Sequence, residues 1–401
     1  MKILVLSNKP PYPTVDGGTF ATFQLVKDLA DASNEVFVLA MVTSKHPSSI
    51  DEIPESIKKK ITFQFVPINS DVTISGIIRN FLRSDLPYTA ERFISKDFSS
   101  ALVGVLAEHT FDLIQLEGLY LTPYIPLLKK ESKIPVVLRA HNIEHEIWKR
   151  LSSNHKNPIK RFYFKNLTKR ISNFEYDVID TYDLLVPITK VDEKKFNSMG
   201  NSKPSVVIPV GVNNETVVTK SNEGQKTTLF YLGALDWQPN TEGLLWFIKK
   251  VWPQIKADYP NLEFHIAGRN APPGFQKLVA DDRIIFHGEI PSAKDFILKN
   301  TIMVVPLFSG SGMRVKIIEA MSYGKAIVTT RVGAEGIDVI NGEHILISDN
   351  AVGIITSIKQ LIENDNFLSK IESNARNLVQ QSYMGDKLAE ELTEEYHKLI
   401  K

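Results

Sequence analysis

The sequence predicts an α/β protein built from two doubly wound domains. Short apolar runs alternate with segments of helical periodicity almost throughout the 401 residues. The runs are continuously apolar, as expected for parallel strands that are covered on both faces. The pattern stops at a polar stretch near residues 210–227 and then starts again. That stretch has the composition of a linker, so it divides the chain into two halves.

The first half, residues 1–212, is predicted to form one domain. Residues 3–6 ("ILVL") predict a first strand, and residues 20–33 carry apolar side chains at helical spacing. Further strands are predicted from the apolar runs at residues 35–42, 111–117, 135–140, 184–189 and 205–209. The order strand, helix, strand is typical of a parallel sheet with crossover helices.

The second half, residues 213–383, is predicted to form a similar domain. Residues 241–256 ("TEGLLWFIKKVWPQIK") predict a helix. Apolar runs predict strands at residues 228–234, 262–268, 283–288, 301–307 and 326–330. The chain ends in a charged amphipathic helix at about 384–401. Ligands usually bind at the carboxyl ends of the strands in such domains, so the loops there are the candidate sites.

Composition narrows the classes of function. Hydrophobic residues make up 43% of the chain and the net charge is +1, as in an ordinary globular protein. Near-neutral charge argues against a dedicated nucleic-acid binder. The absence of cysteine rules out disulfides, thiolate zinc sites and a cysteine nucleophile, and favours the cytoplasm. The short apolar start is predicted to be a strand and not a signal peptide, and no apolar run is long enough to predict a transmembrane helix.

The first candidate loop is "SNKPPYPTVDGGTF", which follows the first strand. Gly17 and Gly18 open a helix, so their backbone N–H groups can face an anion or a sugar oxygen. The alternative is a flexible loop before a helix start. The glycine spacing differs from G-x-G-x-x-G, so a dinucleotide fingerprint is not indicated.

The second candidate loop is "VVLRAHNIEHEIW", in which His141 follows an apolar strand. The position favours a histidine that orients a substrate, with a structural histidine as the alternative. His141, Glu144 and His145 together suggest a zinc site. Their spacing is not that of H-E-x-x-H, so no metal is predicted.

The third candidate loop is "GSGMRVKIIEAMSYGKAIVTT", residues 310–330. Gly310 and Gly312 allow backbone amides to approach an anion, and Arg314 and Lys316 are predicted to lie in the first turn of a helix. Cations there oppose the helix dipole, so a bound diphosphate is a sensible counter-ion. Glu319 follows on the same face as Lys316. The alternatives for this carboxylate are a surface ion pair with Lys316 and a hydrogen-bond acceptor for a ribose diol.

At this point the chain resembles the retaining glycosyltransferases of family 4, group 1. The motifs are "GG" before the first helix, "RAHNIE", "VIPVGV", "YLGALDW", "HIAGRN" and "IIEAMSYGKAIVTTRVGAEGI". They extend over nearly the whole chain, and the last is the most specific. The resemblance implies the GT-B fold, in which two Rossmann-like domains face each other across a cleft. It also implies that the final helix crosses back to the acceptor-side N-terminal domain.

The resemblance also implies roles for the candidate residues. A nucleotide-sugar donor would lie mostly on the C-terminal domain, with Glu319 on its ribose hydroxyls and His141 on the transferred sugar. Gly17 and Gly18 would face the sugar phosphate. The remaining donor-binding residues implied are Arg269, Gly310, Ser311 and Gly312.

Two departures from the family pattern matter. The first glutamate of the E-x7-E motif is replaced by Ser311, which leaves the identity of the donor sugar open. The arginine and lysine that usually follow the first strand of the C-terminal domain are absent from "LDWQPNTEG". A subgroup with DW-PN and G-x-R-x-K-x-x-E motifs is more similar to this chain. It implies that the catalytic cations are Arg314 and Lys316.

The sequence therefore predicts a retaining, metal-independent glycosyltransferase of bacterial surface polysaccharide assembly, without a cofactor. It would move a sugar from a nucleotide-sugar to a glycan or lipid-linked acceptor. The alternatives are another GT-B sugar-nucleotide enzyme, such as an epimerase, and a non-catalytic sugar-nucleotide-binding protein. The basic, aromatic stretch between Ile147 and Phe174 suggests peripheral contact with an anionic membrane at the cytoplasmic face, or else a solvated basic surface.

Overall fold

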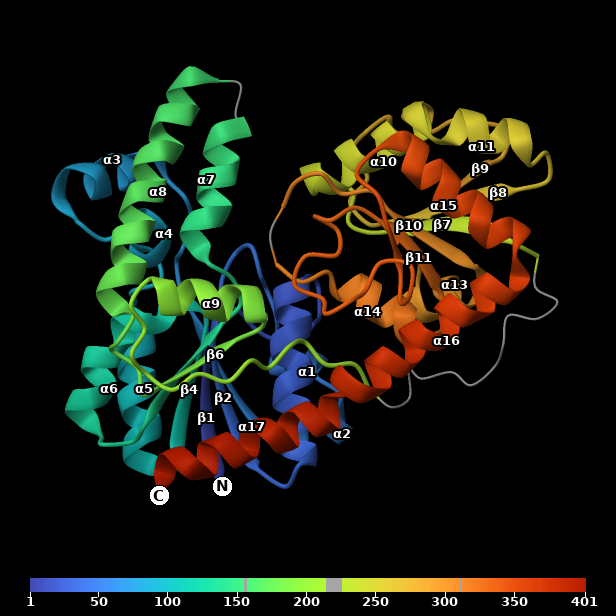
Figure 1. Ribbon diagram of the computed structural model, residues 1–401. Coiled ribbons are helices and arrows are strands. Elements are labelled where there is room, and N and C mark those ends of the chain that lie inside the picture. Colours follow the sequence, from blue (N-terminus) through green and yellow to red (C-terminus); the bar gives the residue numbers. More distant parts are fainter. Residues whose placement is uncertain (155–156, 214–225, 311) are drawn as a thin grey trace. The chain divides into compact units, whose positions relative to one another are not determined.

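A computed structural model describes residues 1–154, 157–213, 226–310 and 312–401. The chain forms two compact units (Figure 1). Unit 1 comprises Met1–Gly211 with Gly385–Lys401, and unit 2 comprises Val212–Met384. Among the described residues, no helix has the length and apolar character needed to cross a lipid bilayer.

Unit 1 is built around a six-stranded sheet in the order β3-β2-β1-β4-β5-β6. Every neighbouring pair of these strands is parallel. The strands are β1 (Lys2–Ser7), β2 (Glu35–Val42), β3 (Ile61–Pro67), β4 (Leu113–Glu117), β5 (Val136–Ala140) and β6 (Leu184–Pro187). Strands β1, β4, β5 and β6 are almost entirely buried, which explains their continuous apolar sequence.

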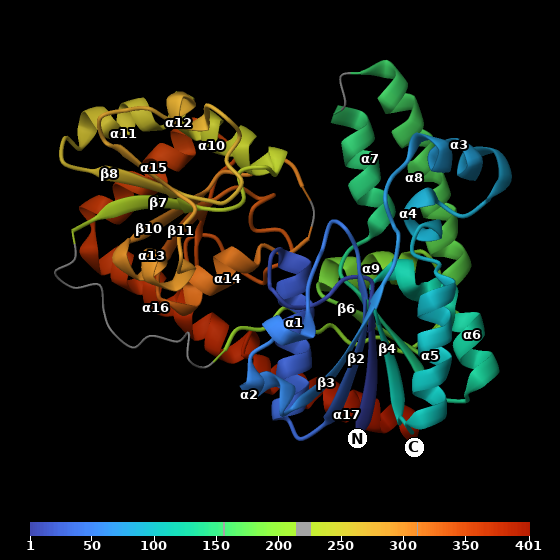
Figure 2. The same cartoon turned by 180° about the vertical axis from the view of Figure 1, so that it is seen from behind.

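Helices cover both faces of this sheet (Figures 1 and 2). Alternate residues of β1 point to opposite faces of the sheet. Leu4 packs in the hydrophobic core that includes residues of α5, and Ile3 packs in the core that includes residues of α1 and α17. The helices are α1 (Gly17–Asp31), α2 (Glu55–Lys58), α3 (Ile74–Arg83), α4 (Tyr88–Glu91), α5 (Lys96–Glu108), α6 (Ile125–Glu131), α7 (Glu144–Asn154), α8 (Pro158–Val178), α9 (Lys190–Ser198) and α17 (Gly385–Ile400). Two 3₁₀ turns, Ile50–Glu52 and Leu119–Tyr124, complete the unit.

Unit 2 contains a second six-stranded sheet, in the order β12-β11-β10-β7-β8-β9, again with parallel pairs. Its strands are β7 (Thr228–Leu232), β8 (Glu263–Ala267), β9 (Ile284–Gly288), β10 (Ile302–Val305), β11 (Ala326–Thr329) and β12 (Leu346–Ile347). Its helices are α10 (Gln238–Lys250), α11 (Trp252–Asp258), α12 (Phe275–Leu278), α13 (Ala293–Lys299), α14 (Val315–Ser322), α15 (Ala351–Glu363) and α16 (Asp365–Ser382).

The two sheets have the same strand order when each is numbered from its own first strand. In both, the order reverses beside the first strand, between β1 and β4 and between β10 and β7. Ligands of doubly wound folds bind at the carboxyl ends of the strands at such a reversal. The predicted pair of doubly wound parallel sheets is confirmed.

The structure differs from the predicted elements in two places. The run at 205–209 forms no regular strand, although Val206 and Ile208 donate backbone hydrogen bonds to the edge of β6. The helix predicted over 241–256 is two helices, α10 and α11, because Pro253 supplies no N–H at the junction. Most of the predicted linker, residues 214–225, lies outside the described residues.

Candidate functional site

Candidate residues gather at the carboxyl edge of unit 2, where β10 and β7 are neighbours. The loop after β10 contains Gly310 and Gly312, both with positive φ, of 110° and 83°. These values suit glycine, which lacks a Cβ. A Cβ on Gly310 would lie 2.8 Å from Nη2 of Arg314 and 2.9 Å from the ring of Trp237. Gly310 thus lets an arginine and a tryptophan close against the backbone. Ser311 lies outside the described residues.

Arg314 is the N-cap of α14, so it precedes the helix and does not lie in its first turn as predicted. Its side chain is buried. The guanidinium carbon lies 5.3 Å from the centroid of Trp237, a residue of the loop after β7. Stacking on an aromatic face fixes the plane of a guanidinium while leaving its charge intact. The loop "LDWQPN" therefore contributes a platform for the cation.

Lys316 lies in the first turn of α14 and points toward β7. Its Nζ donates a hydrogen bond to Oδ1 of Asn240 at 3.2 Å and lies 4.8 Å from the ring centroid of Tyr231. Asn240 is itself held, because its Nδ2 donates to the carbonyl of Ala234 at 2.8 Å. Burial, reinforced by the neighbouring Arg314, lowers the pKa of Lys316 to about 7. Within the part of the chain that the structure describes, the charged form of this lysine therefore has no compensating anion.

Glu319 does not pair with Lys316. Within the described part of the chain, its carboxylate has no hydrogen-bond or ion-pair partner, and burial raises its pKa. The surface-pair interpretation is therefore wrong, because Lys316 is directed to Asn240 and Tyr231 instead. An acceptor group with two free oxygens can accept two hydroxyl hydrogen bonds.

Arg269 lies immediately beyond β8, beside β7 in the sheet. Its backbone carbonyl accepts a hydrogen bond from the N–H of Leu235 at 2.9 Å, which ties the two strand-end loops together. Its side chain is partly exposed. Among the described residues its side chain makes no hydrogen bond or ion pair. Arg269 thus belongs to the same edge of the sheet but not to the packed pair of cations.

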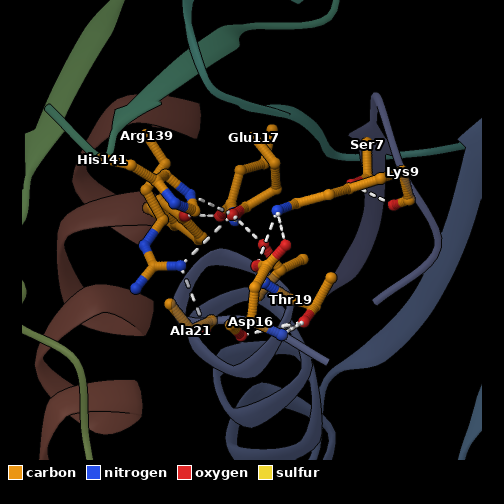
Figure 3. Close-up of polar contacts among 11 residues, drawn as sticks. Ser7, Lys9, Asp16, Thr19, Ala21, Glu117, Arg139 and His141 are labelled. Atoms are coloured by element: carbon orange, nitrogen blue, oxygen red, sulfur yellow. Dashed lines mark hydrogen bonds and ion pairs between the residues drawn. The ribbon is translucent and has the colours of Figure 1, made fainter. Parts of the chain in front are cut away.

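The carboxyl edge of unit 1 carries a different arrangement, centred on Glu117 at the end of β4 (Figure 3). Its Oε2 accepts hydrogen bonds from Thr22 at 2.8 Å, from Arg139 at 3.2 Å and from His141 at 2.7 Å. Its Oε1 accepts from Gln115. We call these five residues the Glu117 network.

The Glu117 network is buried and electrically compensated. Burial alone would raise the pKa of Glu117, but the Arg139 charge and the hydrogen bonds from His141 and Thr22 outweigh it and lower the pKa to about 2. Arg139 is also buried, and its Nη1 donates to the carbonyl of Ala21 at 3.2 Å as well as to Glu117. The network ties α1, β4 and β5 together.

This network determines that Nε2 of His141, which faces Glu117, carries a proton. An ionised carboxylate only accepts hydrogen bonds, so the Nε2 that faces Glu117 must carry a proton. The other ring nitrogen, Nδ1, is then an acceptor in the neutral ring and a donor in the charged ring. A buried carboxylate behind an imidazole fixes the orientation of the ring. His141 can therefore direct one defined nitrogen at a ligand.

The network extends to the C-terminal helix. The hydroxyl of Tyr396, in α17, donates to Oε1 of Gln115, and the amide of Gln115 donates to Glu117. Gln115 and Tyr396 are fully buried. The two bonds leave Gln115 only one satisfied orientation. Helix α17 thus helps to set the position of Glu117, and through it that of His141.

Gly17 and Gly18 lie in the first turn of α1, beside a lysine that no motif in the sequence indicated. Nζ of Lys9 lies 2.7 and 2.9 Å from the two carboxylate oxygens of Asp16, which is the N-cap of α1 (Figure 3). A Cβ on Gly18 would lie 2.8 Å from Nζ of Lys9. The amides of the first turn have no partner within the helix. Lys9 therefore lies, paired with Asp16, at the helix start where the sequence predicts an anion contact.

The three residues considered for zinc have separate partners. His141 bonds Glu117, Glu144 accepts from the hydroxyl of Tyr120 at 2.8 Å, and His145 bonds Glu175. No group of three metal-ligating side chains occurs in the parts of the chain that the structure describes. Burial raises the pKa of Glu144 to about 7, although the bond from Tyr120 opposes the shift.

Both units thus present charged and hydrogen-bonding side chains at the reversal of a doubly wound sheet, as in two-domain α/β proteins that bind nucleotides. Comparison with known proteins specifies the class. Residues 226–364 match the family model described as glycosyl transferases group 1. The match covers most of unit 2, and the solved structures of similar fold show that the whole chain has a two-domain α/β GT-B fold.

Three similar proteins extend over nearly the whole chain. A Klebsiella pneumoniae protein described as an uncharacterized 44.6 kDa protein in the cps region is 24% identical over 396 residues, which is 96% of this chain and 97% of that one. The Anabaena protein HepE, solved in complex with UDP, has a TM-score of 0.69 at 15% identity and covers 99% of this chain and 100% of its own. The sucrose-phosphate synthase of Thermosynechococcus elongatus has a TM-score of 0.72 at 16% identity, with 100% and 99% covered.

Proposed function

We propose that the protein is a retaining glycosyltransferase that uses a nucleotide-sugar donor. The observation that carries this proposal is the pair of packed cations, Arg314 and Lys316, in a domain that matches the glycosyl transferases group 1 model. Negative charge grows on the diphosphate as the bond to the anomeric carbon breaks. Cations fixed beside it therefore stabilise the transition state more than the ground state.

The other candidate residues take supporting roles in this proposal. Glu319 accepts hydrogen bonds from the ribose hydroxyls, and Gly310 and Gly312 lie beside the diphosphate. Nδ1 of His141 faces the transferred sugar, with Glu117 behind the ring. The diphosphate is neutralised by protein cations, so the reaction needs no metal ion and no cofactor.

We place the reaction in the assembly of a bacterial surface polysaccharide at the cytoplasmic face of the membrane, on a glycan or lipid-linked acceptor. The similar Klebsiella pneumoniae protein, which is described as lying in a cps region, supports this setting. Exposed cations on α7 and α8 support contact with an anionic membrane: they are Lys149, Lys160, Arg161, Lys165 and Lys169. Arg170 does not contribute, because its guanidinium bonds Asn80. Lys156 lies outside the described residues.

Turnover of a panel of nucleotide-sugars tests the proposed function. The purified chain should release the nucleoside diphosphate from one donor, and faster when its acceptor is present. Nuclear magnetic resonance of the product should show the anomeric configuration of the donor. Interconversion of free sugar-nucleotides would instead identify an epimerase. Binding, detected as a thermal shift, without any turnover would identify a non-catalytic binding protein.

A further inference from the structure

Helix α3 in unit 1 turns its apolar face to solvent. The exposed fractions are 79% for Ile74, 54% for Ile78, 47% for Phe81 and 73% for Leu82. These positions are spaced by four, seven and eight residues from the first, so they form one stripe along the helix. A globular protein normally buries such a stripe against its core. Here the fold leaves it uncovered.

The opposite face of α3 is anchored by polar contacts. Asn80 is buried, its Nδ2 donates to the carbonyl of Leu86 at 2.9 Å, and its Oδ1 accepts from Nη1 of Arg170 in α8 at 2.9 Å. Gly76, on the same face, leaves no room for a Cβ against the hydroxyl of Tyr88. The helix is therefore fixed in place without its apolar stripe. The stripe is free for another role, and truncating it should not unfold the unit.

Two cations lie to one side of the stripe. Arg79 and Arg83 are exposed on one flank of α3, which contains no acidic residue. The bounding acids, Asp71 and Asp85, lie outside the helix ends. In both views α3 lies beside α8 (Figures 1 and 2), in agreement with the bonds from Arg170 to Asn80. Helix α8 adds exposed apolar and basic residues near its start: Ile159, Lys160, Arg161, Phe162, Lys165 and Lys169.

We propose that α3 and the exposed face of α8 dock unit 1 onto an anionic lipid bilayer, with the stripe of α3 inserted at the level of the headgroups. An apolar face flanked by arginines is typical of helices that lie in the plane of a membrane interface. The basic side chains would meet anionic lipid headgroups. This inference deepens the membrane contact proposed above, because it assigns the insertion to α3, which lies outside the basic stretch identified in the sequence.

Charge favours a bilayer over a second copy of the chain. In a symmetric dimer each partner presents the same patch to the other. Arg79, Arg83 and the cations of α8 would then face cations of the same kind, which is unfavourable. An anionic membrane instead meets both the charge and the apolar stripe with complementary chemistry.

Co-sedimentation of the full-length chain with vesicles tests this assignment. One set of vesicles is phosphatidylcholine alone, and the other is phosphatidylcholine mixed with phosphatidylglycerol. The stripe variant is Ile78→Ser with Leu82→Ser, and the charge variant is Arg79→Glu with Arg83→Glu. The matched control truncates two exposed apolar residues of unit 2, with Leu278→Ser and Val352→Ser. Circular dichroism checks the fold of each variant, and size-exclusion chromatography reports its oligomeric state.

The wild type and the control should bind the anionic vesicles, and high salt should weaken that binding. The partition coefficient onto anionic vesicles should fall about tenfold or more in each α3 variant. The stripe variant loses apolar area at the interface, and the charge variant reverses the charge there. Three results would overturn the proposal: equal binding by the stripe variant, no binding by the wild type, or a wild-type dimer that the stripe variant converts to a monomer. Donor turnover without vesicles is measured on the same samples. If the vesicles bind as expected but no donor reacts, the proposed function fails and the docking surface stands. If a donor reacts but the vesicles do not bind as expected, the docking surface fails and the proposed function stands.

Discussion

The carboxyl edges of the two sheets share a strand order but differ in how their charges are balanced. In unit 1, Glu117 accepts from Thr22, Arg139, His141 and Gln115, and its pKa is about 2. In unit 2, burial lowers the pKa of Lys316 to about 7 and raises that of Glu319. The Glu117 network is therefore a charge set that is complete without a ligand, whereas unit 2 holds groups whose charged forms a ligand would stabilise. Perturbed groups of the second kind are the better indicators of a binding site.

The largest expected effect is the loss of stability when Glu117 is removed from the Glu117 network. Glu117→Gln leaves the buried Arg139 without its carboxylate, so the free energy of unfolding should fall by about 3–5 kcal/mol. The pKa of Glu117 is lowered on folding, so its contribution is present above the unfolded pKa of about 4.5 and is lost as the pH falls toward about 2. Denaturation curves against pH measure both effects. Glu108→Gln, at the exposed end of α5, is the matched control, and equal stability of the two variants would contradict the charge balance.

Removing Arg314 or Lys316, the cations at the carboxyl edge of unit 2, should lower activity without lowering stability. Arg314→Ala and Lys316→Ala should each lower kcat/KM by about 10²-fold or more, the scale for an oxyanion stabiliser. Arg314→Lys should restore only part of the loss, because a point charge does not reproduce a forked guanidinium. Lys316→Met should raise the melting temperature, because a buried lysine with a lowered pKa destabilises the fold below pH 10.5.

Steady-state kinetics and melting curves on the same samples check these expectations. Lys277→Ala removes an exposed cation of the same unit and should change neither quantity. Normal turnover in both alanine variants would show that this loop does not hold the leaving group.

A smaller loss should follow from Glu319→Gln, because the amide offers one acceptor oxygen where the carboxylate offers two. Loss of charge-assisted bonds to a diol suggests a weakening of donor binding by about 1.5–3 kcal/mol. Isothermal titration calorimetry with UDP measures it, with the exposed Glu289→Gln as a control. An affinity equal to that of the control would remove Glu319 from the site.

Unit 2 should take up a proton when an anionic ligand binds beside Lys316. The Glu117 network, whose charges are already compensated, would not need one. An anion near Lys316 raises its pKa from about 7 toward the ordinary value of 10.5. Above pH 7 the affinity for UDP should therefore fall as the pH rises, by at most about tenfold per unit. Calorimetry in buffers of different ionisation enthalpy reports the proton directly. Lys316→Met should abolish the uptake, and an unchanged uptake would assign it to another group.

The smallest expected effect is that of a chelator. Protein cations take the place of a divalent ion in the proposed reaction, and the sequence contains no Asp-x-Asp triplet. Turnover should be the same with and without excess EDTA. Loss of activity that magnesium or manganese restores would mean that a metal ion, and not the pair Arg314 and Lys316, balances the diphosphate.

Much of the fold could be predicted from the sequence, because buried parallel strands such as 135–140 are continuous apolar runs. Less of the candidate site could be predicted from the sequence. Glu117 ends a predicted strand, but nothing local shows that it meets Thr22, Arg139 and His141, which come from other elements. Lys316 and Asn240, which share a hydrogen bond, are 76 residues apart in the sequence. The motif DW-PN marked that loop, but spacing alone does not indicate that Trp237 stacks on Arg314.

The bond from Tyr396 to Gln115 has a consequence for biosynthesis. Helix α17 follows all of unit 2 along the chain, yet it packs in the core of unit 1. A ribosome therefore completes the surroundings of Glu117 only after it has made the second unit. We expect a nascent or prematurely terminated chain to lack the support for Glu117 behind His141, so that the proposed activity would appear only when translation has passed both units.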